Sequence, residues 1–305
     1  MHRFLKFCCQ GCFNDYKVIP VGQKNDWHKT GRLKNNKLNF MKNENISVDI
    51  LISTYNWPKA LEKILVSLLD QTRLPDRILI ADDGSGYETE MVIDKYRRFF
   101  NIPVEHIWQE DKGFRKTLIL NKAMKYATSD YIIQIDGDII LDRNFVKDHI
   151  SNARKKTFVQ GCRAILNESK TREIIGNKNL SFKFFSKGIR NRFNALRIPF
   201  LSSFIKTDPY CSRNIKACNL AFWREDYVAV NGYDNLFYGW GLEDDEFAAR
   251  LINYGVKKRR LKLAAICYHL NHEINSKYHE ERNKEIYNET VLSKRSFSRN
   301  GLAQV

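Results

Sequence analysis

YIIQIDGDII, residues 131–140, is the stretch that decides the fold. Its first residues, YIIQI, indicate a strand that is buried on both faces, as in parallel sheets. Two carboxylates, Asp136 and Asp138, then follow with only Gly137 between them, and the apolar run resumes. Because an unpaired buried carboxylate is costly, the pattern predicts that compensating groups lie opposite them.

Strand and helix patterns alternate along the chain before this stretch. Apolar runs bounded by turn residues predict strands, and apolar residues at helical spacing predict helices between them. Such alternation predicts an α/β fold with a mostly parallel sheet and helices on both faces. The strands are expected at 48–54, 77–82 and 104–109, and the helices at 58–71, 87–100 and 114–127.

Polar loops directly follow three of the expected strands. They are STYN (53–56), ADDGS (81–85) and DGD (136–138). In open α/β sheets, ligands bind beyond the carboxyl ends of the strands. We therefore expect the three loops to gather on one rim of the sheet and to form a ligand site there.

The DGD loop has the residue types of a metal site. Two carboxylates one residue apart can face one hard cation, because Gly137 lets the chain turn sharply. Magnesium or manganese held this way keeps positions that substrate phosphates fill. A solvated turn is the alternative for the same three residues. The ADDGS loop also allows two interpretations. Asp82 and Asp83 either begin a turn before Gly84 or accept a hydrogen bond from a nucleobase.

The chain after Asp142 has a weaker pattern. A strand is expected at 216–223, a glycine-rich turn and helix at 237–255, a last strand at 261–269, and a peripheral helix in the charged tail. The segment 180–200, LSFKFFSKGIRNRFNALRIPF, places aromatic side chains on one face and basic ones beside it if it is drawn as a helix. A helix or loop packed on the core and a membrane-surface contact both fit this segment.

Three acidic residues stand where the helix expected within 237–255 should begin. Glu243, Asp244 and Asp245 favour the helix dipole there, but three exceed what capping needs. They follow Trp240 in the turn, and a carboxylate beside an indole can hold a sugar or deprotonate a hydroxyl. Helical phase places Asp244 on the buried side of the first turn and Asp245 to the side.

Two histidines near the end of the last expected strand complete the list of candidates. His269 is a possible third metal ligand, although a single histidine is more often structural. His272 lies three residues further on and competes for the same role.

The composition favours an anionic partner. The chain has 305 residues, with 51 Lys and Arg against 35 Asp and Glu, a net charge of +16. Nucleic acid, an acidic membrane and a phosphorylated small molecule all match that sign. No apolar run reaches the roughly 20 residues of a membrane span. Seven irregularly spaced cysteines indicate a reducing compartment, and we expect a cytoplasmic protein. Cys9 and Cys12 form a lone CxxC, which we interpret as free thiols.

The loops, read together, match a known family. VDILISTYN, ADDGS, GFRKTLILNKA and IDGD resemble, in this order, the nucleotide-binding half of family-2 glycosyltransferases, which have the Rossmann-like GT-A fold. NGYDNLFYGWGLEDDEFAARL resembles the acceptor-side motif of β-1,4-galactosyltransferases and bacterial chondroitin-type polymerases. The resemblance divides the chain into an extension (1–46), a nucleotide-sugar-binding half (47–145), a smaller acceptor-binding half (146–272) and a charged tail (273–305).

The resemblance implies an inverting transfer of Gal, GalNAc, Glc or GlcNAc from a UDP-sugar to a hydroxyl of a glycan or lipid-linked saccharide, with Mn or Mg as the cation. The nucleotide-sugar contacts would be Ser53, Tyr55, Asn56, Asp83, Arg115, Lys116, Asp136 and Gly137. The metal ligands would be Asp136, Asp138 and His269. The acceptor would contact Trp240, Glu243 and Asp245, and Asp244 would be the catalytic base. We also expect a peripheral contact with an anionic membrane and no nucleic acid as partner.

Three other functions were weighed against the residues. A sugar-phosphate nucleotidyltransferase needs a glycine-rich phosphate loop near its first strand, and STYNWPKA contains no glycine. A nucleic-acid-binding protein fits the charge, but no recognition motif of that class is present. A lectin-like domain without catalysis does not account for the complete set of carboxylates.

Overall fold

The computed structural model of the chain describes residues 45–177, 180, 182, 184–273 and 278–305. The expected amino-terminal extension, apart from residues 45 and 46, lies outside these described residues, and so do Cys9 and Cys12.

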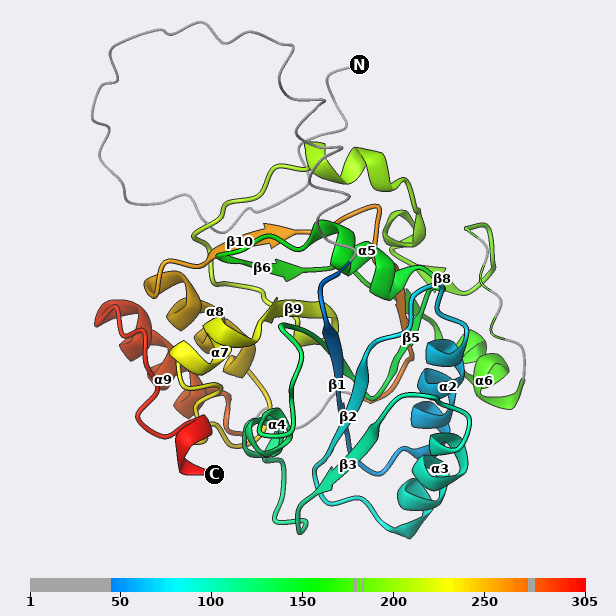
Figure 1. Cartoon of the computed structure of the whole chain (residues 1–305), viewed down its shortest axis with the longest axis horizontal. Coiled ribbons are helices and arrows are strands. Elements are labelled where there is room, and N and C mark those ends of the chain that lie inside the picture. Colours follow the sequence, from blue (N-terminus) through cyan, green and yellow to red (C-terminus); the bar gives the residue numbers. More distant parts are fainter. Residues whose placement is uncertain (1–44, 178–179, 181, 183, 274–277) are drawn as a thin grey trace, which may run out of the picture. The chain divides into compact units, whose positions relative to one another are not determined.

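A seven-stranded sheet forms the centre of the described chain (Figure 1). Its order is β10-β6-β9-β4-β1-β2-β3. All neighbouring pairs are parallel except those of β9, which runs antiparallel to both β4 and β6. The expected mostly parallel sheet is therefore confirmed. The strands are β1 (Val48–Thr54), β2 (Arg77–Asp82), β3 (Val104–Trp108), β4 (Tyr131–Asp136), β6 (Thr157–Gln160), β9 (Leu220–Trp223) and β10 (Lys257–Arg260).

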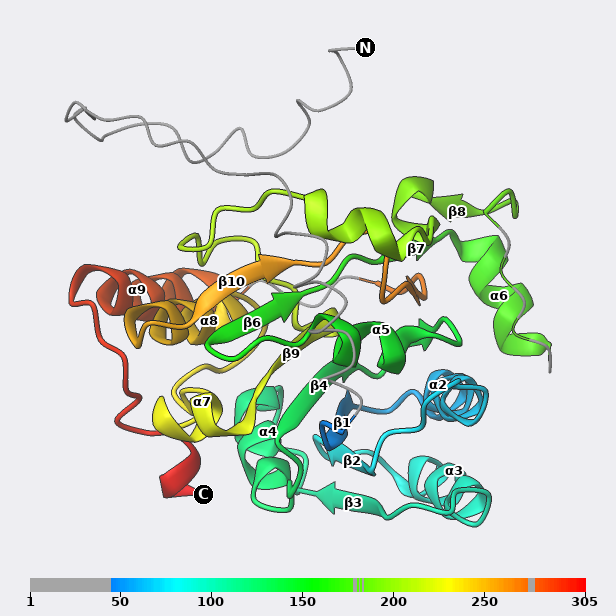
Figure 2. The same cartoon turned by 45° about the horizontal axis from the view of Figure 1, so that its top comes forward.

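Helices cover both faces of this sheet. Figure 2 shows α2 and α3 on one side of it and α4, α7 and α8 on the other. Each side has its own apolar core, and α5 contributes to the core beneath α2 and α3. The bounds are α2 (Pro58–Leu69), α3 (Tyr87–Arg97), α4 (Lys116–Met124), α5 (Phe145–Asn152), α7 (Arg224–Ala229) and α8 (Glu243–Asn253).

The central strands are apolar on both faces because both faces meet helices. Along β1, Ile50 and Ile52 belong to the core on the α2 side, whereas Leu51 belongs to the core on the α4 side. Along β4, Ile133 and Ile132 divide in the same way. The continuous apolar runs of the sequence thus come from burial on two faces.

A second, four-stranded sheet joins the end of β4 to the carboxyl-terminal part of the chain. Its order is β5-β11-β7-β8, and α6 (Glu168–Gly176) packs beside it. The pair β5–β11 is antiparallel and places His269 opposite Ile139, directly after the DGD loop. The strands are β5 (Ile139–Leu141), β7 (Ala164–Leu166), β8 (Ile189–Arg190) and β11 (Cys267–His269).

The structure differs from the sequence expectations mainly after residue 142. The helix drawn through 180–200 is wrong: the described residues of this segment form β8 and the short 3-10 helix η1 (Arg192–Ala195). The left-handed backbone at Gly188 and Asn191 prevents a continuous helix. The strands expected at 216–223 and 261–269 are shorter, because η3 (Ala217–Asn219) precedes β9 and only Cys267–His269 of the second is extended.

The tail is less peripheral than expected. Its helix α9 (Glu280–Leu292) packs on α8, and Asn283 and Thr290 are fully buried. Further on, the buried Ser298 accepts a hydrogen bond at its carbonyl oxygen from the side chain of Asn231. The buried groups are mostly polar, which explains why the apolar pattern gave no sign of this packing. No helix in the described part of the chain is long and apolar enough to span a membrane.

Candidate active site

The end of β4 meets the end of β1 at the rim where the site is expected. Ser53 lies opposite Asp136 in the parallel register, and its hydroxyl donates to Oδ1 of Asp136 at 3.0 Å. A Cβ at position 137 would lie 2.7 Å from the carbonyl oxygen of Ser53. Gly137 does not have a left-handed φ. The chain does turn at Gly137 and Asp138, as expected, but the turn needs no left-handed φ, so the close approach of β1 is what requires a glycine here.

Lys116, the first residue of α4, stands opposite Asp136. Its ammonium lies 2.7 Å from Oδ1 of Asp136, and the side chain is only 12% exposed. Burial alone would lower the pKa of Lys116, but the carboxylates around it, first Asp136, raise it well above its usual value. The same contact holds the pKa of Asp136 below its usual range, although burial alone would raise it. Lys116 and Asp136 thus form an ion pair within the site.

Asp138 faces two histidines. The Nε2 atoms of His269 and His272 lie 3.2 and 2.9 Å from Oδ2 of Asp138. One ligand atom from each of the three residues falls within 4.8 Å of the others. Oδ1 of Asp138 is buried without a hydrogen-bond partner among the described residues. One carboxylate and two imidazoles suit a manganese-like cation, and the unpartnered oxygen leaves a free ligand atom.

Both histidines reach Asp138, so the structure does not separate them, and which of them binds a metal stays a prediction. The hydrogen bond to Asp138 raises the pKa of His272, whereas burial lowers the pKa of His269. Asp136, the other expected ligand, is not part of this group, because Lys116 and Ser53 both bond to its Oδ1. Whether it binds metal stays a prediction.

The ADDGS loop is fixed by hydrogen bonds to Asp83. One carboxylate oxygen accepts from the side chain of Gln109 at 2.6 Å, and the other accepts from the backbone N–H of Arg115 at 2.7 Å. Burial raises the pKa of this carboxyl. The side chain of Arg115 turns away and donates to the carbonyl of Glu110. Gln109 was not among the expected residues, and no sequence motif marks it.

The STYN loop lies against the ADDGS loop. The backbone N–H of Asn56 donates to the Ser85 hydroxyl at 2.8 Å, and its side-chain oxygen accepts from the N–H of Gly86 at 3.0 Å. The Tyr55 hydroxyl donates to Asp111 at 2.9 Å, with half of its side chain exposed. The structure therefore brings these loops together at one rim, as their positions after parallel strands predict.

A strained turn presents the acidic start of α8. Gly239, Gly241 and Leu242 all have positive φ angles, of 72°, 117° and 67°. Leucine is uncommon in this conformation, and such strain collects at functional sites. Trp240 is half-buried within the turn. The turn delivers Glu243 and the residues after it to the rim that Lys116 occupies.

The three carboxylates at the start of α8 have different surroundings. Glu243 accepts from the backbone N–H of Gly241 at 3.0 Å, and burial raises its pKa to about 7. Asp244 accepts from the N–H of Ala217 at 2.9 Å through Oδ2, while its Oδ1 is buried without a partner in the described structure. Burial, and next to it the nearby Asp136 carboxylate, raises the pKa of Asp244.

Asp245 has both carboxylate oxygens occupied. They accept from the backbone N–H groups of Asn214 and Ile215 at 3.1 and 2.6 Å. Burial raises the pKa of Asp245 to about 6. This geometry favours a role in holding the loop before β9, and the acceptor-binding role expected for Asp245 stays untested.

Arg163, which follows β6, is a cation of the site that the sequence did not indicate. Its guanidinium donates to the sulfur of Cys218 at 2.9 Å. Burial alone would lower its pKa, but Cys218 and the carboxylates of Asp136 and Asp138 raise it. The guanidinium therefore lies near the metal-type cluster while its hydrogen bond goes to a thiol. No motif surrounds it in QGCRAIL, so only the fold reveals it.

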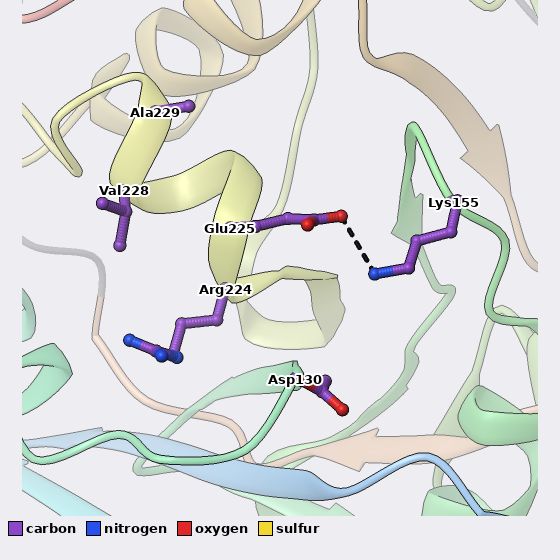
Figure 3. A pocket seen from close by; sticks show the side chains of 6 residues that line it. All are labelled: Asp130, Lys155, Arg224, Glu225, Val228 and Ala229. Atoms are coloured by element: carbon purple, nitrogen blue, oxygen red, sulfur yellow. Dashed lines mark hydrogen bonds and ion pairs between the residues drawn. The ribbon is translucent and has the colours of Figure 1, made fainter.

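A cavity of about 350 Å³ lies at the opposite end of the sheet (Figure 3). Asp130, just before β4, and Arg224, just after the antiparallel β9, are among its lining residues. An ion pair of 2.9 Å between Lys155 and Glu225 crosses it. None of the expected site residues lines this cavity, so it is separate from the candidate site.

A family model described as glycosyl transferase family 2 matches residues 49–210. The chain belongs to glycosyltransferase family 2. A second model, described as the N-terminal domain of galactosyltransferase, matches residues 203–273, which include the GWGLEDD turn and both histidines. The two matches overlap at residues 203–210, and the predicted division of the chain after residue 145 stays a prediction.

Related proteins of this family include enzymes of polysaccharide synthesis. The chain is 25% identical to the chondroitin synthase of Escherichia coli over 84% of its own length, and to that of Pasteurella multocida over 70%. It spans only 40% and 24% of the lengths of these two relatives. It is also 25% identical to the validoxylamine A glucosyltransferase of Streptomyces hygroscopicus subsp. limoneus over 68% of its length, covering 48% of that protein.

Solved structures with the same fold confirm the predicted GT-A architecture. Residues 1–349 of the S. aureus protein TarS in complex with UDP align with a TM-score of 0.54 and 15% identity, covering 79% of this chain and 64% of that solved chain. The mannosyltransferase PcManGT from Pyrobaculum calidifontis, in complex with GDP-Man and Mn²⁺, aligns with a TM-score of 0.51 and 16% identity, covering 87% and 71%.

Proposed function

We propose that the chain is a metal-dependent, inverting hexosyltransferase that moves a sugar from a UDP-sugar to a hydroxyl of a glycan. One observation carries the proposal: Asp138 and Asp244, on the same rim, each keep a buried carboxylate oxygen without a partner in the described structure. A buried polar atom without a partner is destabilising unless a ligand completes it. A metal-bound donor at Asp138 and an acceptor hydroxyl at Asp244 would complete both.

The donor nucleotide would lie over the STYN and ADDGS loops. Asp83 would accept a hydrogen bond from the uracil N–H, while Ser53, Tyr55 and Asn56 would contact the rest of the nucleoside. Gly137 would let the donor approach the backbone closely. Arg115, although its side chain bonds to a carbonyl here, stays in this proposed group because its backbone orients Asp83.

Asp138, His269 and His272 would hold a manganese or magnesium ion. When bound, such a cation acts as a Lewis acid on the departing diphosphate. Lys116 and Arg163 would bind the diphosphate oxygens from the protein side, because both are cations on this rim. Asp136 would hold the ammonium of Lys116 in place through their 2.7 Å contact.

Asp244 would act as the general base. Its free carboxylate oxygen would take the proton of the acceptor hydroxyl while the hydroxyl oxygen attacks the anomeric carbon of the donor sugar. The bond from this carbon to the diphosphate would break at the same time, which inverts the configuration. The raised pKa of Asp244 suits a group that must accept a proton near neutral pH. Trp240 and Glu243 would hold the acceptor sugar.

The acceptor class follows from the relatives and remains part of the proposal. Chondroitin and hyaluronan synthases among the relatives favour a glycan or a lipid-linked saccharide as acceptor, and Gal, GalNAc, Glc or GlcNAc as the transferred sugar. We include a cytoplasmic location with peripheral contact to an anionic membrane. Cys162, Cys218 and Cys267 are buried free thiols, and a reducing compartment keeps cysteines in this form. Neither nucleotidyl transfer nor nucleic-acid binding is favoured by any observation.

A donor screen tests the proposal. Release of UDP would be measured with a panel of UDP-sugars, with and without a soluble glycan acceptor, in Mn²⁺ or Mg²⁺. We expect one or a few donors to react, excess chelator to abolish transfer, and added cation to restore it. Asp138→Ala should lose metal-dependent UDP binding while staying folded. Asp130→Ala, at the opposite end of β4, is the matched carboxylate control and should react normally. Full transfer in excess chelator would falsify the metal assignment.

A further inference from the structure

Phenylalanine rings are unusually exposed on the segment 184–206. Phe185, Phe193, Phe200 and Phe204 are 80%, 75%, 74% and 75% exposed. Phenylalanine is among the residues most often buried, and a group of exposed apolar side chains marks an interaction site.

The backbone that carries these rings is anchored. Ile189 is buried in β8, and the backbone N–H of Ile198 donates to the carbonyl of Leu263 at 2.8 Å. The guanidinium of Arg197 forms an ion pair of 2.6 Å with the buried Asp148. Figure 2 shows β8 and the turns that follow it along the upper edge of the described chain. The rings therefore project from a fixed support.

Part of the aromatic group is packed together. The ring of Phe184 lies 5.0 Å from that of Phe185 and 6.3 Å from that of Phe193, measured between centroids. Phe200 and Phe204 lie four residues apart in the 3-10 helix η2 (Pro199–Phe204). Edge contacts of this kind keep the rings in place while most of their surface meets solvent.

The charge around the rings is of one sign. The sequence contains no Asp or Glu between Glu173 and Asp208, but it contains seven Lys and Arg there. Lys187, Arg190 and Lys206 are exposed, and none forms an ion pair within the described part of the chain. Unpaired basic side chains beside apolar ones favour a partner that is both apolar and negatively charged.

We infer that this aromatic-basic surface, formed by Phe185, Phe193, Phe200, Phe204, Lys187, Arg190 and Lys206, docks on an anionic lipid bilayer. The rings would enter the interface between headgroups and acyl chains, and the basic side chains would contact anionic headgroups. Rings that protrude from turns suit a soft bilayer better than a preformed groove on a protein. The inference refines the membrane contact within the proposed function, and it replaces the single helix face expected from the sequence.

The location fits an acceptor that is attached to a lipid. The surface includes β8, which pairs with β7, and β7 pairs with the strand that carries His269. One small sheet therefore links the proposed membrane contact to the proposed metal site. A lipid-linked saccharide held at the bilayer would reach the rim from this side of the molecule.

Co-sedimentation with lipid vesicles tests the inference. The full chain would be mixed at low salt with vesicles of neutral phosphatidylcholine and with vesicles that also contain phosphatidylglycerol. We expect binding to the anionic vesicles only. The variant Phe200→Ser/Phe204→Ser should bind about tenfold more weakly, and Lys187→Glu/Arg190→Glu should weaken binding by a similar factor, as raised salt does. Phe99→Ser, at a phenylalanine that is 57% exposed on another face, is the matched control.

The result that overturns the inference is equal or absent binding to the two kinds of vesicle, or normal binding by both double variants. Sedimentation velocity without lipid adds a second readout. If the natural chain sediments as a dimer, and Phe200→Ser/Phe204→Ser sediments as a monomer with unchanged vesicle binding, the surface is an interface between copies of the chain. UDP release with a soluble acceptor should be unchanged in the variants, so a failure of the proposed sugar transfer and a failure of membrane docking remain distinguishable.

Discussion

Two groups of buried acidic residues lie on the same helix, α8, and they differ in how their charge is compensated. Glu246, two residues after Asp244, accepts two hydrogen bonds of 2.8 Å from Arg250 and one of 2.9 Å from Thr290 on α9. Arg250 also donates to two backbone carbonyls, and both members of the pair are 0% exposed. In the first turn, Asp244 has one oxygen bonded and the other without a partner in the described chain.

We interpret Glu246 as a structural charge and propose Asp244 as a functional one. Burial is common to both groups, so burial alone identifies neither. Arg250 and Glu246 satisfy each other, and such networks fix the packing of α9 and of the backbone at residues 230–232. Asp244 and Glu243 share Lys116 with Asp136 and have raised pKa values, which is the arrangement found at reactive sites.

The largest effect should come from the unsatisfied carboxylate. Asp244→Asn keeps the shape of the side chain but removes the base, so kcat should fall by about 10²–10⁴. Affinity for the UDP-sugar, measured by calorimetry, should be nearly unchanged because the nucleotide loops belong to other elements. The free energy of unfolding should not decrease, since a destabilised charge has been removed. Asp245→Asn is the neighbouring control. Near-normal turnover in Asp244→Asn with loss in Asp245→Asn would reverse the assignment.

The Glu246–Arg250 pair should affect stability and leave turnover nearly unchanged, the reverse of the result expected for Asp244. Arg250→Met leaves Glu246 buried without its partner, so the free energy of unfolding should fall by about 3–5 kcal/mol. The folded fraction should keep most of its kcat. Arg172→Met removes the same kind of i,i+4 pair from exposed positions of α6, where Arg172 and Glu168 are 74% and 71% exposed. That control should change stability by less than about 0.5 kcal/mol in urea titrations.

Glu243 should make stability depend on pH. Because burial raises its folded-state pKa to about 7, above the usual 4.5, its carboxyl stabilises the fold most below pH 4.5. This contribution is lost as the pH rises to 7. The side chain of the Glu243→Gln variant cannot ionise. The free energy of unfolding of the variant minus that of the natural chain should therefore increase by about 2–3 kcal/mol between pH 4.5 and pH 8. Urea titrations of the metal-free protein would measure it, with the exposed Glu285→Gln as control. A constant difference across this range would contradict the burial argument.

The smallest effect should come from Arg163. Arg163→Ala would remove a charged donor to the diphosphate. The KM for the UDP-sugar should therefore rise about tenfold, with a smaller change in kcat. Arg163→Lys should recover part of the loss, because it keeps the charge but not the fork of donors. If Arg163→Ala changes only thermal stability and leaves KM unaltered, then the arginine serves Cys218 and the loop around it.

The part of the site that lies on long elements could be predicted from the sequence. The strands before Asp136 and the helix after Gly241 have strong periodicity, and their polar residues are consecutive, so the loops that meet at the rim could be named in advance. Lys116 was named as well, but its contact with Asp136 depends on the distance between α4 and β4. Sequence spacing does not encode that distance.

The missed features lie on short elements or depend on polar contacts. The strands β7, β8 and β11 have two or three residues each, too few for a period to be recognised. They nevertheless bring His269 and His272 to Asp138. Arg163 follows a four-residue strand and has no motif around it. The packing of α9 on α8 includes the buried hydrogen bond from Thr290 to Glu246, which a hydrophobic pattern does not reveal.

The reversed strand β9 has a consequence for the order of events on the ribosome. β9 (Leu220–Trp223) is inserted between β4 and β6, although β4 ends at Asp136, 84 residues before Leu220. At about 5–20 residues per second, synthesis of that interval takes roughly 4–17 seconds. During this time one edge of β4, with its row of isoleucines, has no neighbouring strand to bond to. Unpaired apolar edges promote aggregation, so the yield of soluble nascent protein should fall when elongation through this interval is slowed, and it should rise with a chaperone that covers the edge until residue 223 emerges.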